Sequence, residues 1–145
     1  IDFAVSCAIL AVLFIAYRFV PGPGIAAVPL FLLLAVVTAA GLGLWFAALI
    51  VRYRDIRHLV PFVLQLGLFA SPVGFSSEVV PEQWRLLYAL NPMVGVIDGF
   101  RWAMLGGAHE LDGPTVAVSA VVAVTLLVSW LAYFRRVERT FADVI

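Results

Sequence analysis

The chain has 145 residues, of which 64% are hydrophobic and only 12% are charged. A soluble domain is about 45–50% apolar, and a folded chain of this size hides only about two-thirds of its surface from water. A water-soluble globular protein is therefore excluded. Nine basic residues balance nine acidic ones, which excludes the broad basic surface that binds nucleic acid. The composition indicates an integral membrane protein, or a piece of one, with locally placed charges.

Four apolar segments are long enough to cross a membrane, since a helix needs roughly 20 residues, with a range of about 17–25, to span the hydrocarbon core. The predicted spans are residues 3–20, 25–51, 59–75 and 115–134. A Pro-Gly-Pro-Gly run at 21–24 separates the first two spans, because proline lacks an amide and glycine loosens the backbone. In the second span, Gly41 and Gly43 suit close contact between helices.

Clusters of arginine predict the orientation through the positive-inside rule. One cluster follows the second span at residues 52–57, and another follows the last span at 135–139. We therefore expect both clusters, and the C-terminus, to be cytoplasmic. The segment 76–113, between the third and last spans, is then expected on the outer side of the membrane.

The outer segment contains two short helical patterns. The sequence Pro81-Glu82-Gln83 is typical of a helix start, Asn91-Pro92 interrupts the helix, and Gly106-Gly107 ends the second piece. Thirteen helical residues reach only about 20 Å, so neither piece crosses the bilayer alone. We expect residues 82–105 to form a re-entrant or interfacial helical hairpin. The predicted fold class is an all-α membrane protein with four transmembrane helices and this outer hairpin.

Charged residues in the hairpin form one candidate site. Asp98 and Arg101 are three positions apart, on one helix face, and able to pair. Ionisable groups near membrane depth usually face a bundle interior or a water-filled path. The alternative, given equal weight, is an interfacial helix whose charges lie among lipid headgroups, with Trp84, Tyr88 and Trp102 as an aromatic belt.

No set of residues predicts an enzyme. His58 and His109 fall on opposite sides of the predicted membrane, and the sequence contains neither a phosphate-binding loop nor a serine-nucleophile motif. Any ATP is therefore expected to bind another chain. Serines within the spans, such as Ser119, are expected to pack helices together, and Cys7 is expected to be a small core residue.

The run from Arg52 to His58 has two interpretations. Its arginines suit acidic lipid headgroups, and they also suit a docking surface for a cytoplasmic protein. Asp55, which lies among the arginines, argues against a pure lipid anchor.

Six ordered blocks of sequence carry a family resemblance. They are VRYRDIRHLVPF at 51–62, SPV at 71–73, VPEQWR at 80–85, LNPM at 90–93, GFR at 99–101 and ERTFADVI at 138–145. Together they closely resemble the permease subunits of ABC-2 type polysaccharide exporters, which include the O-antigen and teichoic acid exporters.

The resemblance implies a permease of six transmembrane helices with both termini cytoplasmic, in the plasma (inner) membrane of a bacterium. This chain would supply helices three to six, as a fragment that lacks the main coupling helix. The implied partners are a second permease copy and two cytoplasmic ATP-binding subunits. The resemblance implies no cofactor in this chain, because those subunits would bind ATP and Mg. The implied cargo is a lipid-linked glycan that passes outward.

The resemblance also suggests roles for individual residues. Arg52, Arg54, Asp55 and Arg57 match the family's cytoplasmic loop between spans four and five, which is an expected contact with the ATPase.

A sugar chain stacks on aromatic faces, so we expect the outer hairpin to provide a substrate path or outer gate. The candidate residues for it are Tyr88, Asp98, Phe100, Arg101 and Trp102. Phe69 and Phe75 are further candidates for the aromatic surface. For any single ring, packing against lipid or protein is the favoured alternative.

Two other functions remain open on the sequence alone. One is an ABC-2 permease for a drug, an ion, a lipid or another small cargo. The other is a membrane assembly protein that transports nothing.

Overall fold

The computed structural model describes residues 2–19, 22–106 and 111–142, with side chains described for 5–19, 22–106 and 111–135. Every regular element in those ranges is helical, which confirms the all-α fold class. The elements are α1 (Asp2–Ala16), η1 (Pro23–Ala27), α2 (Val28–Arg52), α3 (Ile56–Ala70), η2 (Ser77–Val79), α4 (Glu82–Tyr88), α5 (Pro92–Met104) and α6 (Gly113–Ala142). His109 and the last three residues of the ERTFADVI block lie outside the described residues, as do the side chains of the whole block.

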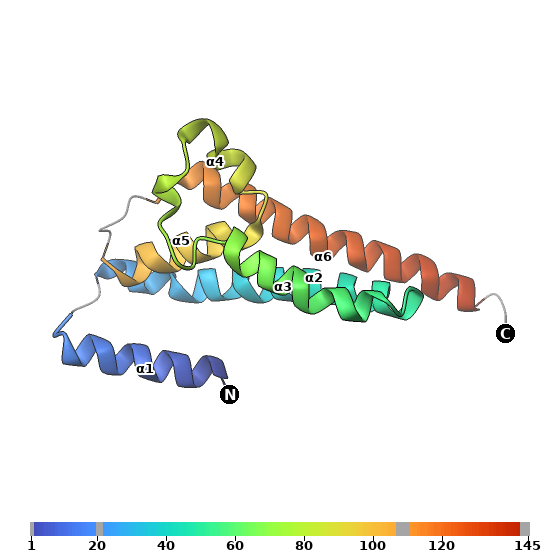
Figure 1. Ribbon diagram of the computed structural model, residues 1–145, viewed down its shortest axis with the longest axis horizontal. Coiled ribbons are helices and arrows are strands. Elements are labelled where there is room, and N and C mark those ends of the chain that lie inside the picture. The colour runs from blue at the N-terminus through green and yellow to red at the C-terminus, as the bar shows by residue number, and fades with distance from the viewer. Residues whose placement is uncertain (1, 20–21, 107–110, 143–145) are drawn as a thin grey trace.

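The structure is organised around α2 and α6. These two helices pack against each other and run in the same direction (Figure 1). By length and composition, the segments Pro23–Arg52 and Gly113–Arg135 are both long and apolar enough to cross a membrane. The shorter helix α5 packs against both of them and against η1, so most of the buried residues lie where these elements meet.

Small residues allow α5 to approach its neighbours closely. A Cβ added at Gly99 would lie 2.0 Å from the ring of Phe31 in α2. A Cβ added at Gly95 would lie 2.5 Å from the Cβ of Ser119 in α6. Both distances are far below the contact distance of two carbon atoms, about 3.5–4.0 Å, so only glycine fits at these positions.

The two glycines of α2 behave differently from each other. A Cβ at Gly41 would lie 3.2 Å from the Cβ of Leu126 in α6, as the predicted helix contact requires, whereas a Cβ at Gly43 would meet nothing within 4 Å. The prediction of a close contact is therefore confirmed for Gly41, whereas Gly43 makes no such contact with the part of the chain that the structure describes.

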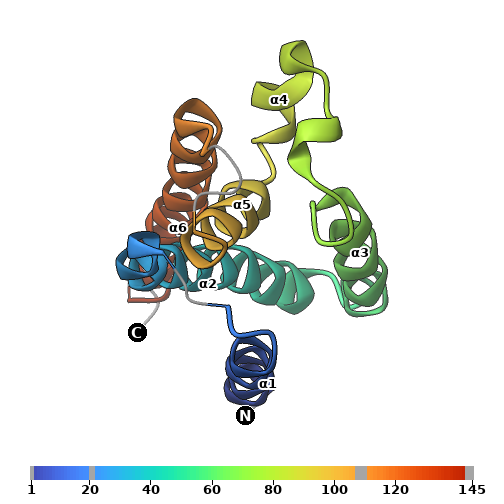
Figure 2. The ribbon, with the colours of Figure 1, turned by 90° about the vertical axis from the view of Figure 1, so that its left-hand side faces the viewer.

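Helices α1 and α3 lie outside this core (Figure 2). α1 makes few contacts with the other helices, and α3 has no buried residue. Cys7, expected in the core, is exposed on α1, because the described chain places no other helix against that face. Apolar helices as exposed as these need lipid or further protein around them.

Two helices end before the predicted spans do. α1 ends at Ala16 rather than at residue 20, since Arg18 adopts a left-handed backbone with φ of 50° and the amide of Phe19 bonds to the Phe14 carbonyl at 2.9 Å. α3 ends at Ala70 rather than at residue 75, because Ser71 is extended and precedes a proline, which disfavours helical geometry.

The other helices differ from the predicted ranges at their ends. A 3-10 helix, η1, precedes α2, which starts at Val28 rather than at residue 25. α3 starts at Ile56 rather than 59, and α6 runs over Gly113–Ala142, beyond both ends of the predicted 115–134.

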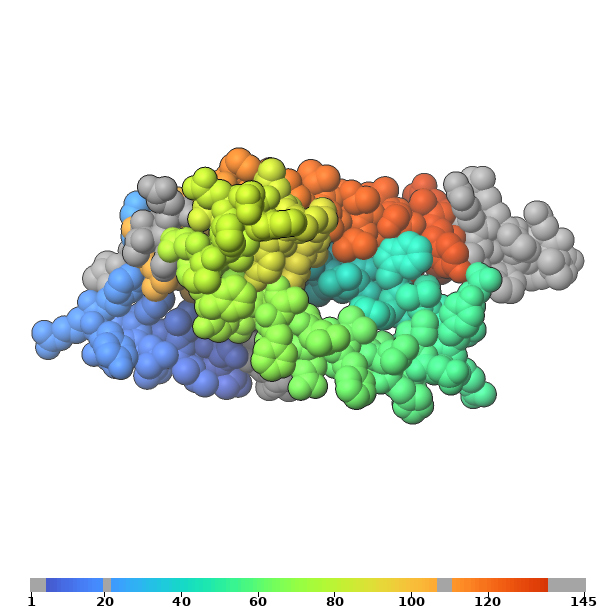
Figure 3. All heavy atoms as spheres, turned by 45° about the horizontal axis from the view of Figure 1, so that its top comes forward, coloured from blue at the N-terminus to red at the C-terminus, as the bar shows by residue number. Residues whose placement is uncertain are grey.

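The segment between α3 and α6 contains the two predicted short helices, α4 and α5. Asn91 and Pro92 separate them, and Asn91 caps α5 by accepting a hydrogen bond from the Met93 amide at 3.1 Å. α5 ends before Gly106, which has a positive φ of 66° and so serves as a C-terminal cap. In Figure 3 this segment, coloured yellow-green, forms one continuous body at the end of the molecule where α6 (orange) begins.

Candidate functional site

The turn between α4 and α5 is held to the end of α3. The side-chain amide of Asn91 donates to the Ser71 hydroxyl at 2.9 Å and to the Ala70 carbonyl at 3.2 Å. Ser71 is 5% exposed, and its own hydroxyl donates to the Gly67 carbonyl at 2.7 Å. These bonds place the start of α5 beside the end of α3. We call residues 89–95 the hairpin tip.

The other side of the hairpin tip is held by α6. The hydroxyl of Ser119 donates to the Ala89 carbonyl at 3.0 Å and accepts from the Gly95 amide at 3.1 Å. Ser119 and Ala89 are fully buried. The predicted packing role of Ser119 is confirmed. Its hydroxyl also supplies a hydrogen-bond partner to two buried peptide groups at once.

Asp98 and Arg101 face each other as their spacing predicts, but their contact is long. One carboxylate oxygen of Asp98 lies 3.8 Å from Nη1 of Arg101. The guanidinium makes shorter bonds to the loop after α3, with Nη1 donating to the Phe75 carbonyl at 2.8 Å and Nη2 to the Val73 carbonyl at 3.1 Å. Arg101 therefore holds that loop against α5 more closely than it holds Asp98.

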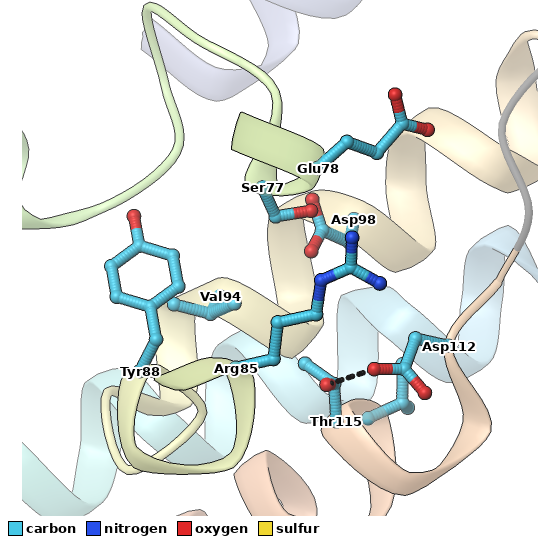
Figure 4. Close-up of a pocket in the computed structure, with 9 residues that line it drawn as sticks. Ser77, Glu78, Arg85, Tyr88, Val94, Asp98, Asp112 and Thr115 are labelled. Atoms are coloured by element: carbon cyan, nitrogen blue, oxygen red, sulfur yellow. Dashed lines mark hydrogen bonds between the residues drawn. The ribbon is translucent and has the colours of Figure 1, made fainter. Parts of the chain in front are cut away.

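A polar cavity of about 40 Å³ lies between η2, α4, α5 and α6 (Figure 4). Figure 4 shows the side chain of Arg85 extending from α4 into the space between Asp98 and Asp112. Its Nε donates to the Val80 carbonyl at 3.2 Å. The complete lining is Ser77, Glu78, Arg85, Tyr88, Val94, Asp98, Asp112, Thr115 and Val116. A cavity of this size has room for a water molecule, and it is too small for a sugar ring.

Tyr88 borders this cavity. Its hydroxyl oxygen is buried and has no hydrogen-bond partner in the part of the chain that the structure describes. Burial raises the pKa of the phenol above its ordinary value, and the nearby Asp98 carboxylate raises it further. The phenol is therefore neutral at physiological pH. Its ring centroid lies 6.4 Å from that of Phe75, which brings together two of the predicted aromatic residues.

The remaining predicted residues of the hairpin lie elsewhere. Phe100 packs against Phe31, with ring centroids 6.3 Å apart. Together with Arg101 it borders a groove of about 360 Å³ that also contacts α1. Trp102 packs beside η1, where a Cβ added at Gly24 would lie 3.6 Å from its ring. Only Tyr88 and Asp98 of the five predicted residues share the polar cavity. Phe100 and Arg101 border the groove beside α1, and Trp102 lies beside η1. The five residues therefore lie in three different places.

The predicted ATPase contact lies at the opposite end of the molecule from the hairpin (Figure 1). Arg52, Arg54, Asp55 and Arg57 are all exposed, at the end of α2 and the beginning of α3. Arg135, on the long helix α6, is also exposed. Within the described ranges, no group of His, Cys, Asp and Glu is arranged to hold a metal ion.

Three residues near the hairpin were not predicted as part of the site. Arg85 and Asp112 line the cavity, and Thr115 donates a hydrogen bond to Asp112 at the start of α6. The Asp-Gly-Pro-Thr sequence that precedes the last span is a recognisable helix-start signal, so the Asp112–Thr115 contact was open to prediction. The approach of Arg85 to Asp112 was not, because it depends on how α4 packs against α6.

Comparison with known proteins agrees with these observations. Residues 1–105 match the family described as ABC-2 type transporter. An O-antigen export system permease protein of Myxococcus xanthus is 29% identical over 98% of this chain and 55% of its own length. A protein of the same description from Klebsiella pneumoniae is 22% identical over 81% of this chain and 45% of its length.

An inner membrane transport permease of Escherichia coli is 31% identical over 60% of this chain and 33% of its length. No solved structure shows significant similarity to the chain. The chain spans about half the length of the O-antigen permeases that it matches. Because the family match covers residues 1–105 of 145, this chain belongs to the ABC-2 type transporter family.

Proposed function

We propose that this chain is the membrane-spanning part of an exporter permease that moves a lipid-linked polysaccharide from the cytoplasmic to the outer side of the bacterial inner membrane. The observation that carries the proposal is the similarity to the O-antigen export permease of Myxococcus xanthus, which extends over 98% of the chain. In this proposal the chain is not an enzyme, and ATP is hydrolysed by a separate ATP-binding subunit on the cytoplasmic side. The permease acts as a homodimer with two such subunits.

The proposed topology has four crossings, with the hairpin on the outer side. Two features of the structure support it. Helices α2 and α6 run in the same direction, as the second and fourth crossings of a serpentine chain must. The exposed arginines that follow the spans, at 52–57 and at Arg135, lie at the same end of the molecule, which the positive-inside rule assigns to the cytoplasm together with the C-terminus.

Helix α3 is too short to cross the membrane by itself. Its 15 residues reach only about 22 Å, against a hydrocarbon thickness of about 30 Å. The hairpin tip is hydrogen-bonded to the end of α3 through Asn91, and α5 continues from there toward the end of the molecule where α6 begins (Figure 1). We infer that α3 and α5 complete one crossing together, with α4 and α5 as a re-entrant hairpin.

The topology is tested by cysteine labelling. In a background where Cys7→Ala removes the single cysteine, the variants Glu82→Cys and Asp55→Cys place thiols on exposed residues of the hairpin and of the arginine cluster. A membrane-impermeant maleimide added to intact cells should label the first variant and not the second. Labelling of both, or of the second alone, would reject the proposed orientation.

We propose that the hairpin acts as the outer gate. The supporting feature is that polar contacts through Asn91, Ser119 and Arg101 join its tip and sides to α3, to the loop after α3 and to α6, so a change in those contacts would be passed to the outer end of the molecule. The exposed rings of Phe69 and Phe75 lie on the adjoining end of α3 and its loop, where a sugar chain would stack.

The proposed ATPase contact is the exposed run with Arg52, Arg54, Asp55 and Arg57. Charge reversal by Arg54→Glu and Arg57→Glu in the complete protein should weaken binding of the ATP-binding subunit while insertion into the membrane continues. Co-purification of the two subunits measures the effect, and the amount of permease in the membrane fraction is the control. Unchanged co-purification would count against this contact.

The export function is tested by replacement in a strain that lacks its own O-antigen permease. We expect the complete protein, expressed with its ATP-binding subunit, to restore glycan at the cell surface. An ATP-binding subunit unable to hydrolyse ATP is the matched control. Glycan that stays in the cytoplasm in both strains would reject the cargo assignment.

The competing proposal is an ABC-2 permease for a drug, an ion, a lipid or another small cargo. The similar inner membrane transport permease of Escherichia coli has a name that specifies no cargo. Glycosyltransferase genes beside this gene would favour the polysaccharide. If no ATP-binding subunit co-purifies under gentle extraction, a non-transporting assembly protein becomes the better explanation.

A further inference from the structure

Arg52 lies in a pocket with three aromatic side chains, between the end of α2 and the facing side of α6. The pocket has a volume of about 330 Å³, and its walls include Trp45, Tyr53 and Tyr133. The guanidinium carbon of Arg52 is 5.6 Å from the ring centroid of Tyr53. A cation over an aromatic face at this distance is attracted to the ring, so the guanidinium is held at the pocket.

Trp45 makes one wall of the pocket rigid. Its indole Nε1 donates to the Leu126 carbonyl and to the Ser129 hydroxyl of α6, both at 3.1 Å. Its ring centroid lies 5.6 Å from that of Tyr133. The two helices are therefore joined beside the pocket, and a ligand meets a preformed surface, which lowers the entropic cost of binding.

The structure separates Arg52 from the rest of the arginine cluster. Arg54, Arg57 and His58 border a different pocket, of about 360 Å³, at the connection between α2 and α3. Arg52 borders the pocket between α2 and α6, where it is the one charged residue among the described residues of the lining. No described carboxylate in that lining competes for its guanidinium. The Arg52 pocket is thus a positively charged site with apolar walls.

We propose that the Arg52 pocket binds the phosphate of an anionic phospholipid at the membrane surface where α2 and α6 emerge. Guanidinium and phosphate form charge-assisted hydrogen bonds, and the hydroxyls of Tyr53 and Tyr133 are further donors. Tryptophan and tyrosine favour the level of the headgroups, and basic pockets between spanning helices on the cytoplasmic side bind lipid headgroups. The inference depends on the proposed location of the end of α2 at the cytoplasmic surface of the membrane, and it does not depend on the cargo.

Native mass spectrometry of the complete protein in detergent tests the proposal. The protein is titrated with dioleoyl phosphatidylglycerol and, separately, with dioleoyl phosphatidylcholine, and the bound lipid is counted. We expect Arg52→Gln to weaken phosphatidylglycerol binding about tenfold, as the loss of one charge-assisted contact predicts. Tyr133→Phe should cause a smaller loss. Arg54→Gln is the matched control. It removes the same charge from a residue only two positions along the chain that borders the other pocket, and it should leave lipid binding unchanged.

The other outcomes overturn the inference. Equal loss in Arg52→Gln and Arg54→Gln would mean that general surface charge attracts the lipid. Equal binding of the two lipids would mean that the negative charge is not recognised. Displacement of phosphatidylglycerol by millimolar inorganic phosphate would assign the pocket to a free phosphate. If Arg52→Gln releases the ATP-binding subunit and leaves lipid binding intact, Arg52 belongs to the ATPase contact. None of these results depends on glycan export, so failure here is distinguishable from failure of the proposed function.

Discussion

Replacing Gly99 by alanine should disturb the packing of α5 against α2. The added Cβ would lie 2.0 Å from the nearest ring carbon of Phe31, whereas two carbon atoms require about 3.5–4.0 Å. Phe31 is only 4% exposed, so its ring has little free space to enter. Overpacking of this kind costs about 1–3 kcal/mol, and the gain from replacing a helical glycine is about 0.5–1 kcal/mol. The two ranges leave a net loss of about 0–2.5 kcal/mol, and because the contact is as short as 2.0 Å we expect about 1–2 kcal/mol.

Thermal unfolding of the purified protein in detergent measures this loss, with an expected decrease in midpoint of about 2–8 °C. Gly43→Ala is the matched control, because nothing lies within 4 Å of the added atom, and it should be neutral or slightly stabilising. Adding Phe31→Leu to Gly99→Ala should recover part of the loss by making room for the methyl group. If Gly99→Ala is as stable as Gly43→Ala, or if Phe31→Leu deepens the loss additively, the close packing argued here is refuted.

The remaining substitutions test the hairpin. Ser119→Ala removes two hydrogen bonds of the tip and should cost about 1–2 kcal/mol; faster amide exchange at residues 89–95 is the expected signal, and unchanged exchange would contradict it. Asn91→Ala should speed exchange at the start of α5 in the same way, because its cap and its bonds to α3 are lost. Arg101→Gln should reduce export, since it removes two hydrogen bonds that hold the loop after α3 against α5; export equal to that of the unchanged protein would contradict this role. Tyr88→Phe should remove a phenol that titrates above its ordinary pKa in an ultraviolet absorbance titration, because burial raises the pKa of Tyr88 above 10.0. The neutral phenol stabilises the fold below pH 10.0 and this stabilisation is lost as the pH rises through the raised pKa; an unchanged titration curve above pH 10.0 in the variant would disprove the assignment.

Features that depend on residues next to one another in the sequence were predictable. The break at Asn91-Pro92, the helix start at Glu82 and the end of α5 before Gly106 follow from local backbone preferences, which the residue types themselves report. The apolar segments that form α2 and α6 were predictable for the same reason, because an uncharged run of this length has few alternatives to a helix in a membrane.

Features that depend on packing were not predictable. The spacing of Asp98 and Arg101 correctly indicated that they share a helix face, but the shorter bonds of Arg101 go to carbonyls 26 and 28 positions away. Similarly, Asn91 was recognised as a helix breaker, while its bonds to α3 reach 20 and 21 positions back. No helical or strand periodicity encodes such partners, because they arise only after α3, α5 and α6 have assembled.

The contacts of the hairpin tip also bear on how tightly the protein seals the membrane. A chain that reverses direction inside a bilayer exposes peptide groups at its helix ends, and hydrocarbon offers them no partner. Here the side chains of Asn91 and Ser119 bond to the carbonyls of Ala70 and Ala89 and to the amide of Gly95. These peptide groups need no water as a substitute partner. At these three peptide groups the reversal needs no water to enter the bilayer, which limits leakage beside the tip.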